Sequence, residues 1–197
     1  MKKALLVVGI AFILCSLAFS QPFGIKFGMS MEELKTVATI IKEVEDGFFI
    51  INPQKKSNYF KEYAVSITQK YGVIAITALG NEIENDEYGI TIKSEAEKVV
   101  KQLTDVYGKP YLVLDELKEG SIWTEPRDWL TSVRKKERDY VYYWVPDLKN
   151  EIDLIALGIG FKNTYSNVCF LDFECFSLDY NKAISERLLQ KSLSFRC

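Results

Sequence analysis

The stretch of the chain richest in chemical groups is GSIWTEPRDWLTSVRKKERD, residues 120–139, where two indoles stand among carboxylates. Ligand sites combine aromatic surfaces with a few placed polar groups, so such a segment could line a groove for a carbohydrate or a peptide. Trp123, Glu125, Asp128 and Trp129 are therefore the candidate ligand-binding residues. The alternative is that the tryptophans plug a long connection, with Trp129 on the core-facing side of a short helix. Loops inserted in a scaffold often carry function, which favours this segment as the candidate site.

A second pair of carboxylates, Asp172 and Glu174, lies in the strand-like segment CFLDFEC. Alternate residues of a strand share a face, so the pair could act as acid and base or bind a hard cation. Apolar neighbours on the same face would raise the pKa of either group. The alternative is a solvated sheet face that carries two acids. With no third acid close in sequence, no metal site is expected.

Histidine is absent from the 197 residues. This excludes Ser-His-Asp and Cys-His nucleophile systems, histidine acid–base catalysis and most zinc enzymes. Gly24 and Gly28 precede an expected helix, but the dense glycines of a dinucleotide loop and the Gly-Lys-Ser/Thr of a P-loop are missing. They are interpreted as turn residues. We therefore expect no cofactor, no metal and no catalytic residue, although carboxylate or lysine chemistry stays possible.

The first twenty residues, MKKALLVVGIAFILCSLAFS, have the layout of a bacterial export signal: two lysines, an apolar run and small residues before a cleavage point. Cleavage is expected near Ser20–Gln21, which predicts a periplasmic or secreted protein. The apolar run is shorter than the roughly 20 residues of a membrane span. Membrane contact is expected only through an uncleaved signal or through a lipid on Cys15, which Leu14 disfavours because lipoprotein processing prefers a small residue there.

The charge balance argues against nucleic acid as a partner. Of 25 basic residues, the expected cleavage removes Lys2 and Lys3 and leaves 23 against 27 acids, a net charge near −4. The longest basic run is only Arg134–Lys136, whereas nucleic-acid-binding proteins carry basic patches. A protein partner at the cell envelope is the expectation instead.

Three cysteines follow the leader: Cys169, Cys175 and Cys197. The first two are six residues apart in an expected strand, which places their Cα atoms about 20 Å apart, too far for a bridge. Any disulfide would therefore include Cys197. Two buried thiols at Cys169 and Cys175 are the favoured interpretation.

The apolar periodicity predicts alternating helices and strands. Two Ser-x-x-Glu capping boxes, at Ser30 and Ser94, are expected to start the first two helices. The expected helices are 31–42, 94–108, a short one from about 126 with Thr124 as cap, and 180–191. The expected strands are 47–51, 63–68, 73–79, 140–145, 152–162 and 168–176, with 111–136 otherwise irregular.

This order predicts an α+β fold of two αβββ modules, with antiparallel sheet and helices packed on one face. The expected divisions are a signal peptide (1–20), a first module (21–87), and a second (88–197) with an inserted loop at 111–136 and a C-terminal helix. Phe23–Phe27 can be aligned with Tyr88–Ile92, which suggests an internal duplication.

Aromatic side chains at Tyr140, Tyr142 and Trp144 alternate along one expected strand. Cross-strand aromatic packing accounts for such a ladder. If that face were exposed, it would instead be a binding surface.

Two short segments carry a family resemblance: FGMSMEELK, which begins at Phe27, and LTDVYGKP, residues 103–110. The first resembles the Gly-Met-Ser/Thr helix start of BamE-like (SmpA/OmlA) outer-membrane assembly lipoprotein modules. The other segment is similar to a helix ending common in uncharacterised exported bacterial proteins. The resemblance implies antiparallel sheet packed on helices and protein binding at the envelope. It carries no catalytic residue, and the chain departs from those modules, which are usually lipidated, helix-paired and about half its length.

Overall fold

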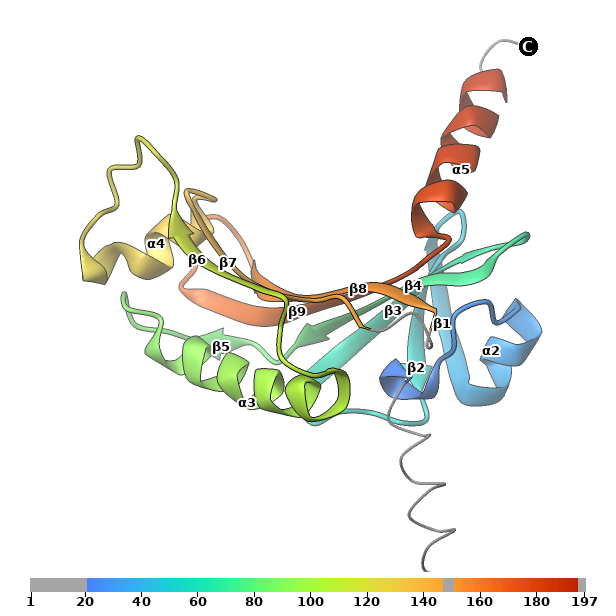
Figure 1. Ribbon diagram of the computed structural model, residues 1–197, viewed down its shortest axis with the longest axis horizontal. Coiled ribbons are helices and arrows are strands. Elements are labelled where there is room, and N and C mark those ends of the chain that lie inside the picture. Colours follow the sequence, from blue (N-terminus) through green and yellow to red (C-terminus); the bar gives the residue numbers. More distant parts are fainter. Residues whose placement is uncertain (1–20, 147–150, 195–197) are drawn as a thin grey trace, which may run out of the picture.

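The computed structural model describes residues 21–146 and 151–194. Within these ranges nine strands form one antiparallel sheet in the order β1-β2-β3-β4-β9-β8-β7-β6, and β5 pairs with β9 beside β4 (Figure 1). This confirms the α+β class. The strands are β1 (Ala38–Glu45), β2 (Phe48–Pro53), β3 (Phe60–Thr68), β4 (Gly72–Gly80), β5 (Ile83–Glu84), β6 (Leu112–Leu117), β7 (Arg138–Trp144), β8 (Ile152–Phe161) and β9 (Val168–Ser177). The helices are η1 (Pro22–Gly24), α2 (Met31–Val37), α3 (Ile90–Tyr107), η2 (Pro126–Asp128), α4 (Trp129–Arg134) and α5 (Tyr180–Ser194).

The first capping box is confirmed. Ser30 Oγ accepts from the Glu33 amide, and the Glu33 carboxylate accepts from the Ser30 amide at 2.8 Å. The predicted end of this helix at 42 is wrong, because α2 stops at Val37 and Ala38 begins β1. The following Thr-Ile-Ile run is β-branched, and such residues favour a strand over a helix. The backbone N–H of Gln54 donates to the Val37 carbonyl at 2.9 Å. This bond fixes the point where the chain leaves α2 and enters β1.

The second capping box is wrong. Helix α3 begins at Ile90, with Gly89 as its N-cap in the left-handed region, so Ser94 lies inside the helix. The free amides of the first turn are satisfied from upstream instead: Asp86 Oδ1 accepts from the Ile90 amide, and Asn85 Oδ1 accepts from the Ile92 amide at 2.8 Å. The predicted end at Gly108 is confirmed.

Asn85 is buried, and its Nδ2 also donates to the Ile83 carbonyl and to Cys169 Sγ, each at 3.1 Å. An Asn85→Ala variant is expected to lose about 2 kcal/mol of unfolding free energy, because it removes a cap and leaves a buried amide unsatisfied. Urea unfolding followed by tryptophan fluorescence measures this loss. Asn81→Ala, which deletes a more exposed amide bonded to Asn58, serves as control; equal losses in the two variants would refute the capping role.

The segment 111–136 is more regular than expected. It contains β6, which pairs with β7 from Leu112 to Leu117, and then η2 and α4. The short helix from 126 is confirmed, but the residue at its N-cap is Glu125 and not Thr124. The strand was missed because β6 is the last strand of the sheet, and YLVLDEL shows no clean alternation of apolar and polar residues.

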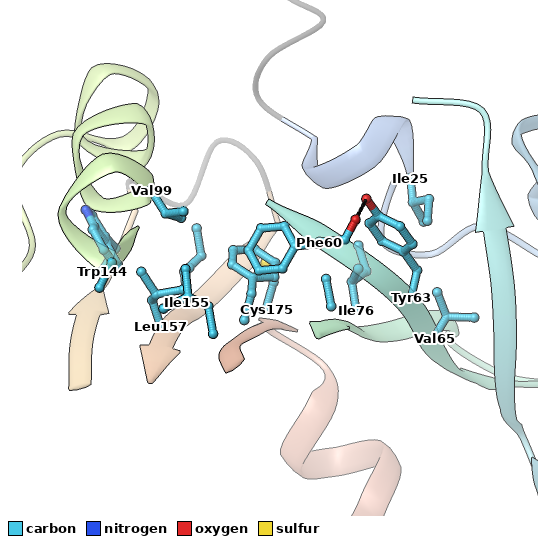
Figure 2. Close-up of a cluster of buried hydrophobic side chains, with 14 of the residues drawn as sticks. Ile25, Phe60, Tyr63, Val65, Ile76, Val99, Trp144, Ile155, Leu157 and Cys175 are labelled. Atoms are coloured by element: carbon cyan, nitrogen blue, oxygen red, sulfur yellow. Dashed lines mark hydrogen bonds between the residues drawn. The ribbon is translucent and has the colours of Figure 1, made fainter. Parts of the chain in front are cut away.

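The two sheet faces differ in what covers them. Helix α3 lies on one face and α5 stands on the opposite side (Figures 1 and 2). The α3 side holds the hydrophobic core, which includes Val99 of α3 and Trp144 of β7. Trp144 Nε1 donates to the Gly108 carbonyl at 3.0 Å and so ties the end of α3 to the sheet.

The aromatic ladder of β7 belongs to this core. Tyr140 and Tyr142 meet edge to face at 5.6 Å between ring centroids, and Tyr142 stacks on Trp144 at 6.2 Å. Tyr140 and Trp144 are buried and Tyr142 is half-buried. The ladder therefore packs along β7 on the α3 side of the sheet and is not an exposed binding surface; these ring contacts lie within one strand and not across strands.

The alternation in β9 is confirmed. Cys169 and Cys175 are free, buried thiols on the core side, and burial raises the pKa of Cys169 to about 12. Asp172 and Glu174 point to the opposite face. Cys197 lies outside the described residues, as do Cys15 and the expected cleavage point.

Each half of the sheet is a meander of four strands that follows a helix: α2 before β1–β4, and α3 before β6–β9. The central β4–β9 pair joins the two halves. The local alignment behind the duplication does not hold in detail, because Phe23–Phe27 is a 3₁₀ turn and extended chain whereas Ile90–Ile92 is the first turn of α3. The duplication itself stays a prediction.

Candidate functional site

The four residues predicted from sequence do not share one environment. Trp129 is 5% exposed, and its Nε1 donates to Asp115 Oδ1 at 3.0 Å. Its ring meets Tyr140 edge to face at 5.1 Å, and the Lys93 ammonium lies 3.7 Å from the ring centroid. Both edge and face of this indole are occupied, so Trp129 acts as the plug between α3, α4 and the sheet.

The other three predicted residues keep solvent access. Asp128 Oδ2 accepts from the Glu125 amide at 3.3 Å, which makes these acids a helix cap of their own segment. Trp123 is half-buried on the preceding loop. What remains of the predicted groove is one half-buried indole, Trp123, on the segment that also carries Glu125 and Asp128, because the second indole, Trp129, is buried.

Asp172 and Glu174 lie half-buried on the face away from α3. Burial, and then the charge of Glu174, raise the pKa of Asp172 to about 6, and burial raises the pKa of Glu174 as well. Across the neighbouring strands Asp172 faces Leu79 and Gly158, which offer no charge, and its Oδ1 is buried without a partner. In the described ranges no group of three or more possible metal ligands occurs.

A cleft of about 960 Å³ lies on the α3 side of the sheet. It opens between η1, the β2–β3 loop at 54–59 and the C-terminal half of α3. The aromatic rings of Phe23, Phe60 and Phe173 form its floor, and Leu103 and Tyr107 of α3 form one wall. Figure 2 shows Phe60 and Tyr63 on the sheet beneath the segment that carries Ile25.

Phe23 is the centre of the aromatic floor. Its ring packs edge to face against Tyr63 at 4.8 Å, Phe173 at 5.6 Å and Phe60 at 5.8 Å. The residue has φ 58°, a left-handed backbone that a bulky side chain rarely adopts. Such an outlier persists only where its surroundings hold it, and here three rings do so. The first segment of the fold is thus shaped around the cleft.

The β2–β3 loop is fixed by Tyr63. The Tyr63 hydroxyl accepts from the Ser57 amide at 3.0 Å and donates to the Phe60 carbonyl at 3.0 Å. Burial raises the pKa of Tyr63, and the same cause raises the pKa of Tyr107 in the cleft wall. Both phenols therefore stay neutral and act as hydrogen-bonding and apolar groups.

Charges stand at the rim of the cleft. Lys55 and Lys56 come from the β2–β3 loop, and Asp105 comes from α3. The Lys55 stem lies against Gly24, where an added Cβ would stand 3.1 Å from Lys55 Cδ. Gly24 therefore lets the loop close over the first segment. Apolar floor and charged rim are the usual composition of a binding cleft.

No protein-family model, curated protein or solved structure that was searched matches the chain. The resemblance of its short segments to BamE-like modules accordingly stays a prediction.

Sequence reasoning missed the cleft. The interpretation of Gly24 and Gly28 as turn residues agrees with the positive φ of 77° at each, but the place of Gly24 at a cleft was not predicted. The available signal was Phe23 itself, an aromatic residue directly before a glycine turn and a capped helix. Its partners Phe60 and Phe173 are distant in sequence, so no local pattern connects them.

The described helices include none that is both long and apolar enough to cross a bilayer.

Proposed function

We propose that the protein is an exported, non-enzymatic bacterial protein that binds an apolar segment of another envelope protein in the cleft beneath α3. The observation that carries the proposal is the cleft itself: about 960 Å³, floored by aromatic rings and rimmed by lysines. The export signal and the absence of histidine in the sequence support it.

The chemistry of the lining defines the partner. Phe23, Phe60 and Phe173 offer ring surface for one or two apolar side chains, which gain most from leaving water. Lys55 and Lys56 stand on one side and favour a carboxylate next to those side chains. The partner segment should therefore combine bulky apolar residues with an acidic one.

A photo-crosslinking residue in place of Val106 tests this function. Val106 lines the cleft and is 38% exposed, so the probe reaches the occupant without disturbing the core. In cells that export the protein we expect discrete protein adducts from position 106, and loss of those adducts when Lys55 and Lys56 are both changed to Glu. The matched control places the probe at Ile90, exposed on the same helix and outside the cleft.

Adducts of equal pattern from positions 106 and 90, or none from 106, would disprove cleft binding. Hydrolysis of a cell-wall or peptide substrate by the purified protein would disprove the non-enzymatic role.

A further inference from the structure

The sheet has two edges in the described part of the chain, and they are built differently. Along β1 the register with β2 shifts twice, once between Ile40 and Lys42 and once between Glu43 and Glu45. Bulges and charges of this kind protect an edge against pairing with other chains. Strand β6 pairs with β7 in unbroken register from Leu112 to Leu117. The β6 edge has no bulge; its charges are Asp115 and Glu116, and Arg138 donates to the Asp115 carbonyl at 3.2 Å.

The free backbone groups of β6 can be assigned. Lys118 N donates to the Glu137 carbonyl at 2.7 Å, in the same register as the β6–β7 ladder. Antiparallel pairs alternate between hydrogen-bonded and non-bonded, so the even-numbered residues of β6 turn their N–H and C=O toward β7. Val113 and Asp115 turn theirs outward. The Asp115 carbonyl accepts one bond from Arg138 at 3.2 Å, which leaves its second lone pair.

The side chains along this edge are apolar and exposed. Tyr111, Leu112 and Val113 are 80%, 43% and 48% exposed, and Val145 beside them is 55% exposed. Val113 pairs with Tyr142 and Leu112 pairs with Tyr143, so these side chains lie on opposite faces of the sheet. An unpaired strand edge with exposed apolar side chains on both faces is a surface for strand addition.

We propose that two copies of the chain pair through β6, antiparallel and related by a two-fold axis at Leu114. In this register the outward N–H and C=O of Val113 in each copy pair with the outward C=O and N–H of Asp115 in the other copy. Leu114 faces Leu114 of the second copy. The pairing ends at Leu112, because the Tyr111 amide already donates to the Tyr143 carbonyl at 2.7 Å. The two sheets become one continuous sheet.

Charge complementarity selects a second copy as the occupant. Lys109 stands just before the strand and Glu119 just after it, and neither has an ion-pair partner within the described residues. The antiparallel pairing brings the end of the strand that carries Lys109 in each copy next to the end that carries Glu119 in the other. Glu116 faces Leu112 and lays its methylene stem on that side chain while its carboxylate stays in water.

The same geometry limits the assembly to two copies. A two-fold contact uses the same edge twice and closes, whereas pairing β6 with β1 of the next copy would continue into a filament. The bulged and charged β1 edge opposes that growth.

The first test uses the protein produced with its own leader and recovered after export. Sedimentation velocity is expected to show a dimer at about 100 µM that dissociates on dilution. Val113→Pro is expected to be a folded monomer, because proline removes an outward N–H that the monomer does not use. Val113→Thr keeps the amide and the shape and should stay dimeric. A wild-type monomer at that concentration, or a dimeric Val113→Pro, would overturn the proposal.

A charge exchange tests the register. Lys109→Glu is expected to weaken dimerisation about tenfold, since it creates two like-charge pairs. Adding Glu119→Lys should restore the dissociation constant to within about threefold of the wild type. If the double variant is as weak as the single one, the proposed register is wrong.

Discussion

A Gly89→Ala variant is expected to lose about 3 kcal/mol of unfolding free energy. Gly89 is the N-cap of α3 with φ 66°, a left-handed conformation that costs a residue with a Cβ about 1 kcal/mol or more. An added Cβ would also run into the six-membered ring of Trp129. Overpacking a filled core typically costs a further 1–3 kcal/mol.

The ring cannot move aside cheaply. Trp129 Nε1 is held by Asp115, which is itself paired with Arg138 at 2.8 Å. Tyr140 blocks the ring on another side. Relief of the clash would therefore break the Trp129–Asp115 hydrogen bond or displace the start of α3.

Gly120→Ala is the matched control. Gly120 has φ 82°, but nothing lies within 4 Å of its added Cβ. This variant carries the conformational cost alone, about 1 kcal/mol. Both variants are compared by urea unfolding with tryptophan fluorescence. If the two lose the same amount, Trp129 does not press against the helix start, and its role as a plug fails.

The elements that the sequence predicted well are those with a one-sided apolar pattern. Strand β9 alternates buried and half-buried residues along its whole length, and its assignment from Cys169 to Cys175 was confirmed. The main errors came where two structures share one pattern. Val37, Ala38 and Ile41 fit a helix, yet Ala38 pairs with Pro53 in β1. Pairing with β2 makes this segment a strand, and the local spacing of apolar residues does not reveal that pairing.

The candidate site was less predictable than the fold. Trp129 was recognised as either a groove or a plug residue, and its contacts identify the plug. The cleft depends on Phe23, Phe60 and Phe173, which are far apart in the chain and meet only because β3 and β9 flank β4 while η1 folds back over them. Sequence patterns report which side of an element is buried. They do not report which buried sides meet, nor where packing leaves a hollow.

On the sheet face opposite the cleft, an Asp172→Asn variant is expected to be more stable than the wild type near neutral pH. Asp172 is placed among apolar and small side chains of β4 and β8, with Glu174 as a like charge on its own strand. The nearest acid across this face on β3 is Glu62, opposite Leu79. No basic side chain pairs with Asp172 among the described residues.

The direction of the Asp172 pKa shift determines how the effect of Asp172→Asn on stability changes with pH. Burial and then Glu174 raise the pKa of Asp172 from 3.8 to about 6, so the folded state disfavours the carboxylate. Below about pH 4 the acid is protonated in both states and the penalty is small; it grows as pH rises from 3.8 toward about 6 and is constant above that. A rise in pKa from 3.8 to about 6 corresponds to about 3 kcal/mol. Because Asp172 is only half-buried, solvent screening reduces the expected gain of Asp172→Asn to about 2 kcal/mol at about pH 8, with little gain at about pH 4.

Urea unfolding of wild type and variant across about pH 4–8 measures this difference. The gain should appear between about pH 4 and about pH 6 and then level off, because the carboxylate is fully ionised above that range. Asp46→Asn removes the same charge from the exposed β1–β2 turn and controls for net charge. A gain at Asp172 that is already present at about pH 4, or that Asp46→Asn reproduces, would show that desolvation of this carboxylate is not its cause. A gain confined to Asp172 and to higher pH identifies a buried acid that the fold tolerates at a cost in stability.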